Sequence, residues 1–370
     1  MRQNRPPPRK PRRHGRSAVT IHDVAARAGV SVATVSRVLN GKEVVREETL
    51  RQVLDAAKAL SYVPNVAARS LSIRRSQTIG IVLPDVHGEL FSEVIRGVDL
   101  AARGASYHIL VSGSHSDLGE VLEVLEAMRG RVDGLVVMAP DAALAPLHEA
   151  LPSDLPLVLL NSTADGRDAI TIDNYGGALT MMRHLAELGH AHIAFINGPS
   201  RNADARERLR GFRDALRGRG VKATRRLELA GDFTEESGHA AARKILTIEP
   251  RPTAIFAAND SMAVGALAAL AEAGVEVPRA MSVAGFDDIP IARYVAPPLT
   301  TIRVDIADLG RRAFGLLLDA IERPAASGRR QDCLATTLVI RKSTCSPETR
   351  LTTSTRPDRT RRGRKKGEES

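Results

Sequence analysis

The sequence predicts a small all-α domain joined to a much larger α/β body built on parallel sheets. Three observations predict this division. Residues 20–60 contain three short amphipathic segments of helical period with a Gly turn after the first. From residue 78, short apolar runs alternate with segments of helical period. The basic charge is concentrated at the two ends of the chain rather than in this body.

The charge distribution separates one part of the chain from the rest. The net charge is +10, with +7 in residues 1–19, +4 in residues 20–76 and +4 in residues 346–370. Residues 77–345 therefore carry about −5. This pattern indicates a nucleic-acid-binding end attached to a body that does not bind a phosphate backbone.

Composition excludes several other classes of protein. No run of about 18 apolar residues is present, so we expect no membrane span and a cytoplasmic protein. The two cysteines, Cys333 and Cys345, form no disulfide framework. No phosphate-binding loop, dinucleotide-binding fingerprint or zinc-ligand spacing appears, so no cofactor or metal is expected. His190 and His192 lack further metal ligands and are interpreted as structural.

Strands and helices alternate along the body. Apolar runs predict strands at residues 79–83, 108–111, 135–138, 157–160, 193–196, 254–257 and 282–286. Segments between them predict helices at residues 91–103, 118–129, 176–188, 206–217, 238–246 and 261–273. This alternation is typical of parallel sheets joined by right-handed crossovers, and its length favours two doubly wound sheets over one.

The first helices have clear start and stop signals. Thr20 is expected to cap the first helix, with Asp23 at its third position. Gly29 permits the left-handed residue that ends that helix, and Ser31 then caps a second helix. Val35 and Val38 face inward on the second helix. This order predicts a helix-turn-helix domain that binds double-stranded DNA.

The outer face of the second helix offers side chains for reading DNA. Arg37 is suited to a bidentate contact with guanine, and Val32 and Ala33 to apolar contact with a thymine methyl group. Ser36 lies on the same face, and Thr34 and Asn40 suit phosphate contacts.

The motifs of residues 20–71 are similar to those of the lactose/purine/galactose repressor (LacI/GalR) family of bacterial transcriptional regulators. They are Asp23-Val24-Ala25, Ala28-Gly29-Val30-Ser31, Thr34-Val35-Ser36-Arg37-Val38-Leu39-Asn40 and Tyr62-Val63-Pro64-Asn65. The resemblance extends to about residue 347. It implies a hinge helix that folds only on DNA, with Leu71 wedged into the minor groove of a palindromic operator. Arg46 departs from the Ser or Thr that usually caps the third helix. The candidate DNA-binding residues are Thr20, Ser31, Val32, Ala33, Thr34, Ser36, Arg37, Asn40, Asn65, Ala68, Arg69 and Leu71.

Polar residues follow the predicted strands of the body, where open α/β sheets bind ligands. Asp85, Asn161, Asn197, Asn259 and Asp287 each come at or just after a strand, and acceptors and amides of this kind suit a sugar. The resemblance implies that Arg206 clamps the ligand and that Phe91 stacks on its ring. Members of the family usually have Asn-Pro-Phe-Phe at the position of Gly88-Glu89-Leu90-Phe91. One aromatic residue is absent here and an acid is present, so either the ligand is less flat or Glu89 points away from it. The candidate effector-binding residues are Asp85, Phe91, Asn161, Arg206, Asn259 and Asp287.

The resemblance implies a periplasmic-binding-protein-like body of two lobes, with chain crossings near residues 173–176, 301–304 and 329–333. The predicted division is a disordered basic arm (1–18), a helix-turn-helix domain (19–63), a hinge helix and linker (64–76), an effector and dimerisation domain (77–345) and a disordered basic tail (346–370). The first lobe would hold residues 77–174 and 304–330, and the second residues 175–303 and 331–345. The tail lacks a leucine heptad, so we expect a homodimer.

These features favour a sequence-specific repressor whose operator affinity a small effector controls, most simply a sugar or sugar derivative. The sequence leaves open whether the ligand releases DNA or acts as a corepressor, as in a purine-type repressor. Three other classes fit less well. For an enzyme, the only candidate catalytic pair would be Asp287 and Asp288. A periplasmic sugar-binding component would not explain the DNA-reading end. A non-specific DNA-binding protein would use only the basic tails.

Overall fold

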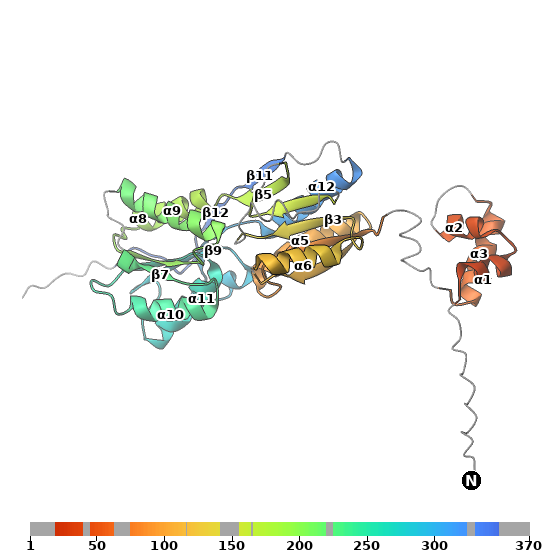
Figure 1. Ribbon diagram of the computed structural model, residues 1–370. Coiled ribbons are helices and arrows are strands. Elements are labelled where there is room, and N and C mark those ends of the chain that lie inside the picture. The colour runs from red at the N-terminus through yellow and green to blue at the C-terminus, as the bar shows by residue number, and fades with distance from the viewer. Residues whose placement is uncertain are drawn as a thin grey trace, which may run out of the picture. The chain divides into compact units, whose positions relative to one another are not determined.

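The computed structural model describes residues 19–39, 45–62, 75–115, 117–140, 155–163, 166–219, 225–323 and 330–347. The chain divides into two compact units between Gln77 and Thr78. Both units are drawn in Figure 1.

The first unit is a small helical domain. Its described helices are α1 (Ile21–Ala28), α2 (Val32–Leu39) and α3 (Glu47–Ala59). Val24, Val35 and Val53, one from each helix, are fully buried at the centre of its core. Three short helices that share one apolar centre form the predicted helix-turn-helix domain.

The second unit contains two parallel sheets, and we call each sheet with its covering helices a lobe. The first sheet has the described strand order β11-β5-β4-β3-β1-β2. The elements of the first lobe are β1 (Thr78–Leu83), α5 (Glu89–Gly104), β2 (His108–Gly113), α6 (Leu118–Met128), β3 (Gly134–Met138), β4 (Leu157–Leu160), β5 (Asp168–Ile172), α12 (Ile306–Glu322) and β11 (Gln331–Leu334). Helices α5 and α12 pack together on one face, and α6 packs on β1 from the other.

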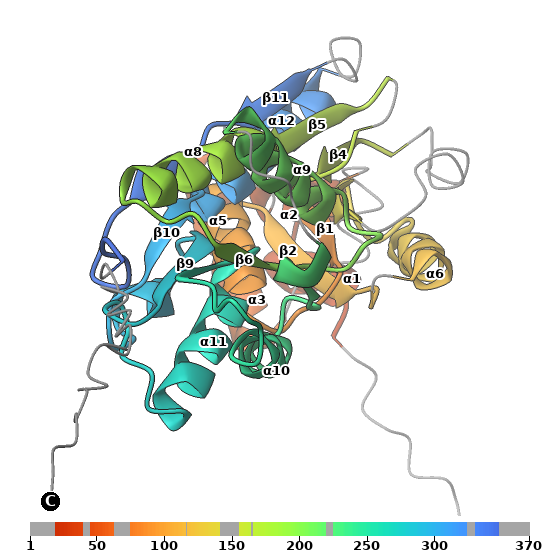
Figure 2. The same cartoon turned by 90° about the vertical axis from the view of Figure 1, so that its left-hand side faces the viewer.

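The second sheet has the described order β12-β10-β9-β8-β6-β7 and is parallel except for β12, which pairs antiparallel with β10. The elements of the second lobe are α8 (Asn174–Glu187), β6 (Ile193–Asn197), α9 (Ala203–Gly218), η1 (Arg225–Leu227), β7 (Glu228–Ala230), α10 (Glu235–Ile245), β8 (Ala254–Ala257), α11 (Asp260–Glu272), β9 (Ser282–Asp287), η2 (Pro290–Arg293), β10 (Thr300–Arg303) and β12 (Thr337–Val339). Helices α8 and α9 pack together, as do α10 and α11, and the two pairs cover opposite faces of the sheet (Figures 1 and 2).

The chain crosses between the lobes after β5, after β10 and after β11. The first two crossings lie close to the predicted ones. The third was predicted too early, because Gln331–Leu334 pairs with β5 and so belongs to the first lobe rather than the second. This edge strand has only one buried residue, Leu334, so it lacks the apolar run that reveals a buried strand.

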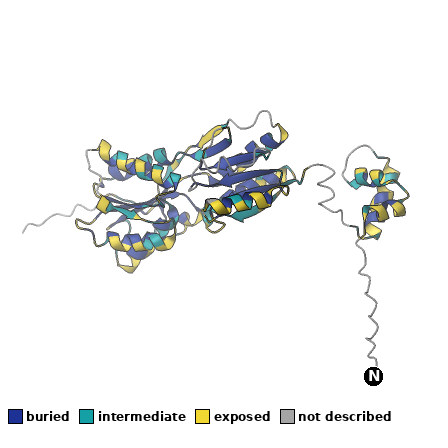
Figure 3. Ribbon diagram, viewed as in Figure 1, coloured by how far each residue is buried: buried dark blue, intermediate teal, exposed yellow. Residues whose placement is uncertain are grey.

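The two-sheet α/β architecture is confirmed, and burial explains why the sequence predicts it. Strands β3, β4, β8 and β9 are buried along their whole length between helical layers (Figure 3). Parallel strands covered on both faces read as continuous apolar runs. Among the described residues, no helix is both long and apolar enough to cross a membrane.

Candidate DNA interface and effector site

Helix α1 begins at a capping interaction between Thr20 and Asp23. The amide and the hydroxyl of Thr20 both donate to the same carboxylate oxygen of Asp23, each at 2.8 Å. Both bonds lower the pKa of Asp23, and the bond from the Thr20 amide has the larger effect. Gly29 adopts φ +64° after the helix, and the amide of Val30 donates back to the Ala25 carbonyl. The chain can then turn directly into α2.

Helix α2 presents a polar face, as a recognition helix requires. The hydroxyl of Ser31 accepts a bond of 3.1 Å from the amide of Thr34, so Ser31 caps the helix as predicted. Ala33 and Arg37 are exposed, and Thr34 and Ser36 are half-buried. Val32 was predicted on the outer face, but it is half-buried and packs against the small core.

The remaining predictions for this unit concern the start of α3 and five of the candidate DNA-binding residues. Arg46 precedes α3 without a capping side-chain bond, so the predicted weak cap is confirmed. Asn40, Asn65, Ala68, Arg69 and Leu71 lie outside the described residues.

Arg37→Gln is expected to weaken binding to the operator by about 1–3 kcal/mol and to reduce the preference for it over random DNA. Fluorescence anisotropy on operator and scrambled duplexes at one salt concentration measures both effects. Arg51→Gln on α3 is the charge-matched control, because loss of a general electrostatic contact weakens both duplexes alike. An unchanged operator preference in the Arg37 variant would refute its role in reading bases.

In the second unit, polar side chains gather at the carboxyl ends of the strands. We call Asn161, Asn174, Asp204, Arg208 and Asp287 the carboxyl-edge cluster. Asn161 follows β4 in the first lobe with φ +53°, and its Nδ2 donates to Asp204 of α9 in the second lobe at 2.8 Å. Asn174 donates to the other oxygen of Asp204 at 2.7 Å. The cluster therefore joins the two lobes.

Arg208 is the buried cation of this cluster, with 3% of its surface exposed. Its Nε donates to Asn174 at 2.7 Å, its Nη1 donates to the Ala258 carbonyl at 2.5 Å, and its Nη2 lies 3.0 Å from Asp287. The guanidinium also stacks on Phe286, 3.8 Å from the ring centre. These contacts hold the positive charge at one point beside the strand ends.

Arg206, predicted as the clamping arginine, lies outside the cluster. Its side chain is exposed and donates to the carbonyls of Ser200 and Arg201. The periodicity of α9 could have distinguished the two arginines, because Ala205, Arg208 and Phe212 share the buried face.

Arg208 opposes the effect of burial on two nearby carboxyl groups, those of Asp204 and Asp287. Burial raises the pKa of Asp204 to about 6, partly offset by Arg208. Burial also raises the pKa of Asp287, again opposed by Arg208. The pKa of Asp260 is raised well above its usual value by burial and then by Asp287. Asp260 accepts bonds from Thr301 and from the Ile289 amide, so it serves to hold the strand ends together.

Asn259 has a positioning role that the sequence did not reveal. Its Oδ1 accepts from the Met262 amide and caps α11, and its Nδ2 donates to the Phe233 carbonyl, both at 3.0 Å. Phe233 has φ +75°, a costly conformation for an aromatic residue, and its ring lies against Gly198. Such strain concentrates at functional sites, so half-buried Phe233 joins the candidate site residues.

The first-lobe candidates lie apart from these contacts. Asp85 is exposed and accepts a bond from the His87 amide at 2.9 Å. Phe91 is half-buried and packs on the core of the lobe. Glu89 accepts from the Ile291 amide of η2 at 2.9 Å, so this acidic side chain is directed at the second lobe.

Asp288 and His190, two other residues singled out in the sequence, have structural roles. Asp287 and Asp288 diverge, since Asp287 faces Arg208 whereas Asp288 binds Arg303 and Arg341. His190 bonds to Thr253 and to the Cys345 carbonyl at 2.9 Å each, and burial lowers its pKa. No group of three potential metal ligands occurs among the described residues.

Comparison with known proteins assigns a family to each of the two parts of the chain. Residues 20–65 match the family of bacterial regulatory proteins, lacI family, and residues 182–344 match the periplasmic binding protein-like domain. The HTH-type transcriptional repressor PurR of Edwardsiella ictaluri is 38% identical over 309 residues, which cover 82% of this chain and 90% of that protein.

Two solved structures share the fold. The Lac repressor dimer bound to operator and the anti-inducer ONPF has a TM-score of 0.81 at 31% identity and covers 89% of this chain and 100% of its own. The transcriptional regulator CelR in complex with cellobiose has a TM-score of 0.67 at 32% identity and covers 88% and 99%. The chain therefore belongs to the lacI family of bacterial regulatory proteins.

Proposed function

We propose that the protein is a transcriptional repressor whose operator affinity is set by a sugar or sugar derivative bound at the carboxyl-edge cluster. Two buried amide oxygens with no hydrogen-bond partner among the described atoms support this site most strongly. They are Oδ1 of Asn161 and Oδ1 of Asn197. A buried acceptor without a donor is costly, and a ligand that brings hydroxyl groups removes the cost.

The surrounding groups suit a polyhydroxylated ligand. Arg208 and Asp287 supply groups of opposite charge in the same cluster as Asn161. Phe233 is half-buried and offers an apolar face on which a sugar ring can pack. The similarity to a cellobiose complex supports the same ligand class.

A purine corepressor is the second candidate. The curated relatives at 36–38% identity are named PurR, and strained Phe233 could stack on a flat base. Purine ring N–H groups would also satisfy the two amide oxygens.

Control of DNA binding follows from the position of the cluster between the lobes. Asn161 belongs to the first lobe and Asp204 to the second, and the two are 2.8 Å apart. A ligand that prefers one arrangement of the lobes shifts their equilibrium, and with it the affinity for DNA. Such coupling is typically about 1–3 kcal/mol, or roughly 5–150-fold in affinity.

The proposed repressor acts in the cytoplasm as a homodimer on a palindromic operator. Two recognition helices related by two-fold symmetry would read the two half-sites. The similarity to the operator-bound Lac repressor dimer supports this assembly.

Isothermal titration calorimetry with cellobiose, ribose, hypoxanthine and guanine tests the ligand class. We expect saturable binding of a sugar, weakened about tenfold or more in Asn161→Leu, which removes a buried polar partner. Arg206→Gln, outside the cluster, should bind as the wild type does. Binding of a purine alone would favour the second candidate. Equal binding by Asn161→Leu, with its fold verified by circular dichroism, would place the ligand elsewhere.

A further inference from the structure

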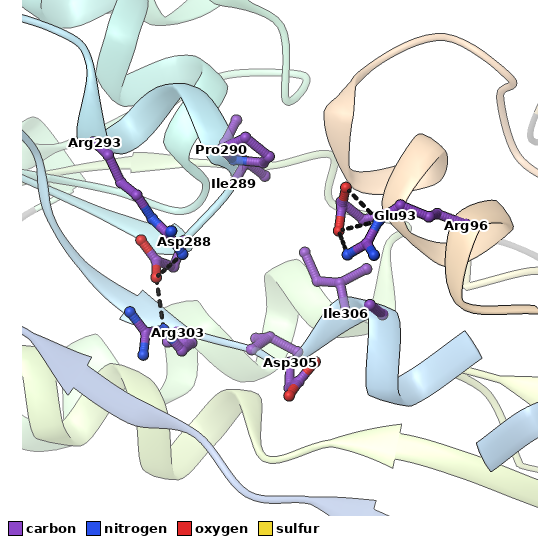
Figure 4. Close-up of a pocket in the computed structure, with 11 residues that line it drawn as sticks. Glu93, Arg96, Asp288, Ile289, Pro290, Arg293, Arg303, Asp305 and Ile306 are labelled. Carbon is purple, nitrogen blue, oxygen red and sulfur yellow. Dashed lines mark hydrogen bonds and ion pairs between the residues drawn. The ribbon is translucent and has the colours of Figure 1, made fainter. Parts of the chain in front are cut away.

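A pocket lined by charged side chains lies at the crossing between the lobes, apart from the carboxyl-edge cluster. Its volume is about 260 Å³ (Figure 4). Its walls come from α5 of the first lobe, from the segment after β9 in the second lobe, and from the β10–α12 crossing. The lining residues are Glu93, Arg96, Asp288, Ile289, Pro290, Arg293, Arg303, Val304, Asp305, Ile306 and Ala307. None of them belongs to the carboxyl-edge cluster.

Three arginines surround one buried carboxylate in this pocket. The side chain of Asp288 is 1% exposed, and its Oδ2 accepts a bond of 2.7 Å from Nε of Arg303. Arg341 donates to Oδ1 of the same carboxylate, and Nη2 of Arg293 lies 3.8 Å from Oδ2. One carboxylate balances only one of the three guanidinium groups. The excess positive charge is on the side chains of Arg293 and Arg303, which are 56% and 46% exposed and line the pocket.

The acidic groups opposite are already engaged. Glu93 forms a two-pronged ion pair with Arg96 on the same helix. The Asp305 carboxylate caps α12, accepting from the Asp308 amide at 3.0 Å. The pocket thus has a positive wall formed by Arg293 and Arg303, and α12, whose N-terminal end is positive, begins beside it.

We propose that this pocket binds a small phosphorylated compound through its phosphate group. Arginine side chains present planar sets of donors that match phosphate oxygens. Here the donors are the guanidinium groups of Arg293 on η2 and of Arg303 on β10, which line the same pocket from two different elements. The volume accommodates a phosphate with a small organic body.

The walls of the pocket belong to both lobes, so its occupant would hold them in one arrangement. One turn before Glu93 on α5, the Glu89 carboxylate already accepts from the Ile291 amide of η2 at 2.9 Å. A phosphate bridging the same elements would act next to this contact. The binding proposal itself does not depend on the proposed repressor function.

Equilibrium dialysis of the full chain with inorganic phosphate, glucose 6-phosphate, glucose and citrate tests the pocket. We expect one saturable phosphate site per chain, weakened about tenfold or more in both Arg293→Gln and Arg303→Gln, since each removes a charged donor. The Arg293 side chain is 56% exposed, and its one ion pair with a described residue is the 3.8 Å contact with Asp288, so its variant tests binding with little effect on the fold. Arg279→Gln, at an exposed arginine paired with Glu276, is the matched control and should bind normally.

The compared ligands and variants distinguish the possible outcomes. Tighter binding of glucose 6-phosphate than of inorganic phosphate would identify a phosphorylated metabolite as the ligand, and equal binding would identify free phosphate. Binding retained in both pocket variants, citrate bound as well as phosphate, or no saturable phosphate binding would overturn the proposal. No operator DNA is used, so the result is independent of the test of the repressor function.

Discussion

Arg208→Ala is expected to lower the free energy of unfolding by about 3–5 kcal/mol, because it leaves a buried carboxylate without its partner. Asp287 faces Arg208 at 3.0 Å with both side chains almost fully buried. The substitution also removes the donors to Asn174 and to the Ala258 carbonyl. Urea unfolding at pH 7, followed by circular dichroism, measures the change.

Arg206→Ala provides a matched control two residues away on the same helix. Its side chain is exposed and bonds only to nearby loop carbonyls, so a change of about 0.5 kcal/mol or less is expected. Equal losses in the two variants would contradict the distinction between a buried cluster arginine and a surface arginine. A larger loss at Arg206 than at Arg208 would likewise contradict it.

Asp204→Asn is expected to stabilise the protein at neutral pH by up to about 3 kcal/mol, since each pKa unit corresponds to 1.36 kcal/mol. The pKa of Asp204 is raised from 3.8 to about 6 in the folded protein. The folded state therefore binds the proton more tightly than the unfolded state. The contribution of this group to stability is complete below pH 3.8 and is lost as the pH rises through 6. An amide does not ionise, so the variant avoids this loss.

The hydrogen bonds of Asp204 can largely be kept in the variant. Oδ1 of Asn161 lacks a partner and could accept from the new amide if the Asn161 side chain turned over. Unfolding free energies at pH 5 and pH 8 should differ less in the variant than in the wild type. Glu207→Gln, in an exposed pair with Arg210, is the control and should leave the pH dependence unchanged. A variant that is less stable than the wild type at pH 8 would contradict the account.

The sequence predicts elements well where burial dictates composition. The strands β1, β3, β4, β8 and β9 were placed within one or two residues because each is a buried apolar run. The edge strands β7 and β11 were missed because neither is a buried apolar run: β7 has three residues, none of them buried, and three of the four residues of β11 are exposed. The formation of an edge strand depends on backbone hydrogen bonds to one neighbouring strand, and these bonds place few constraints on the residue types.

The site was predicted less completely than the fold. The sequence predicts Asn161, Asn259 and Asp287 as candidates because polar residues that follow buried strands gather at one edge of the sheet. Asp204 and Phe233 were missed, since their roles depend on a contact between lobes and on a positive φ angle. Neither feature is encoded in local periodicity.

We expect a small ligand to control sequence-specific DNA binding by this chain. Fluorescence anisotropy of the full chain on palindromic and scrambled duplexes, at fixed salt and with or without the ligand found by calorimetry, tests it most directly. The account predicts tight binding to one palindrome and a shift of roughly 5–150-fold when the ligand is added. Weaker binding with ligand would identify an inducer and tighter binding a corepressor. Binding that ignores both sequence and ligand would contradict the account and leave a non-specific DNA-binding protein.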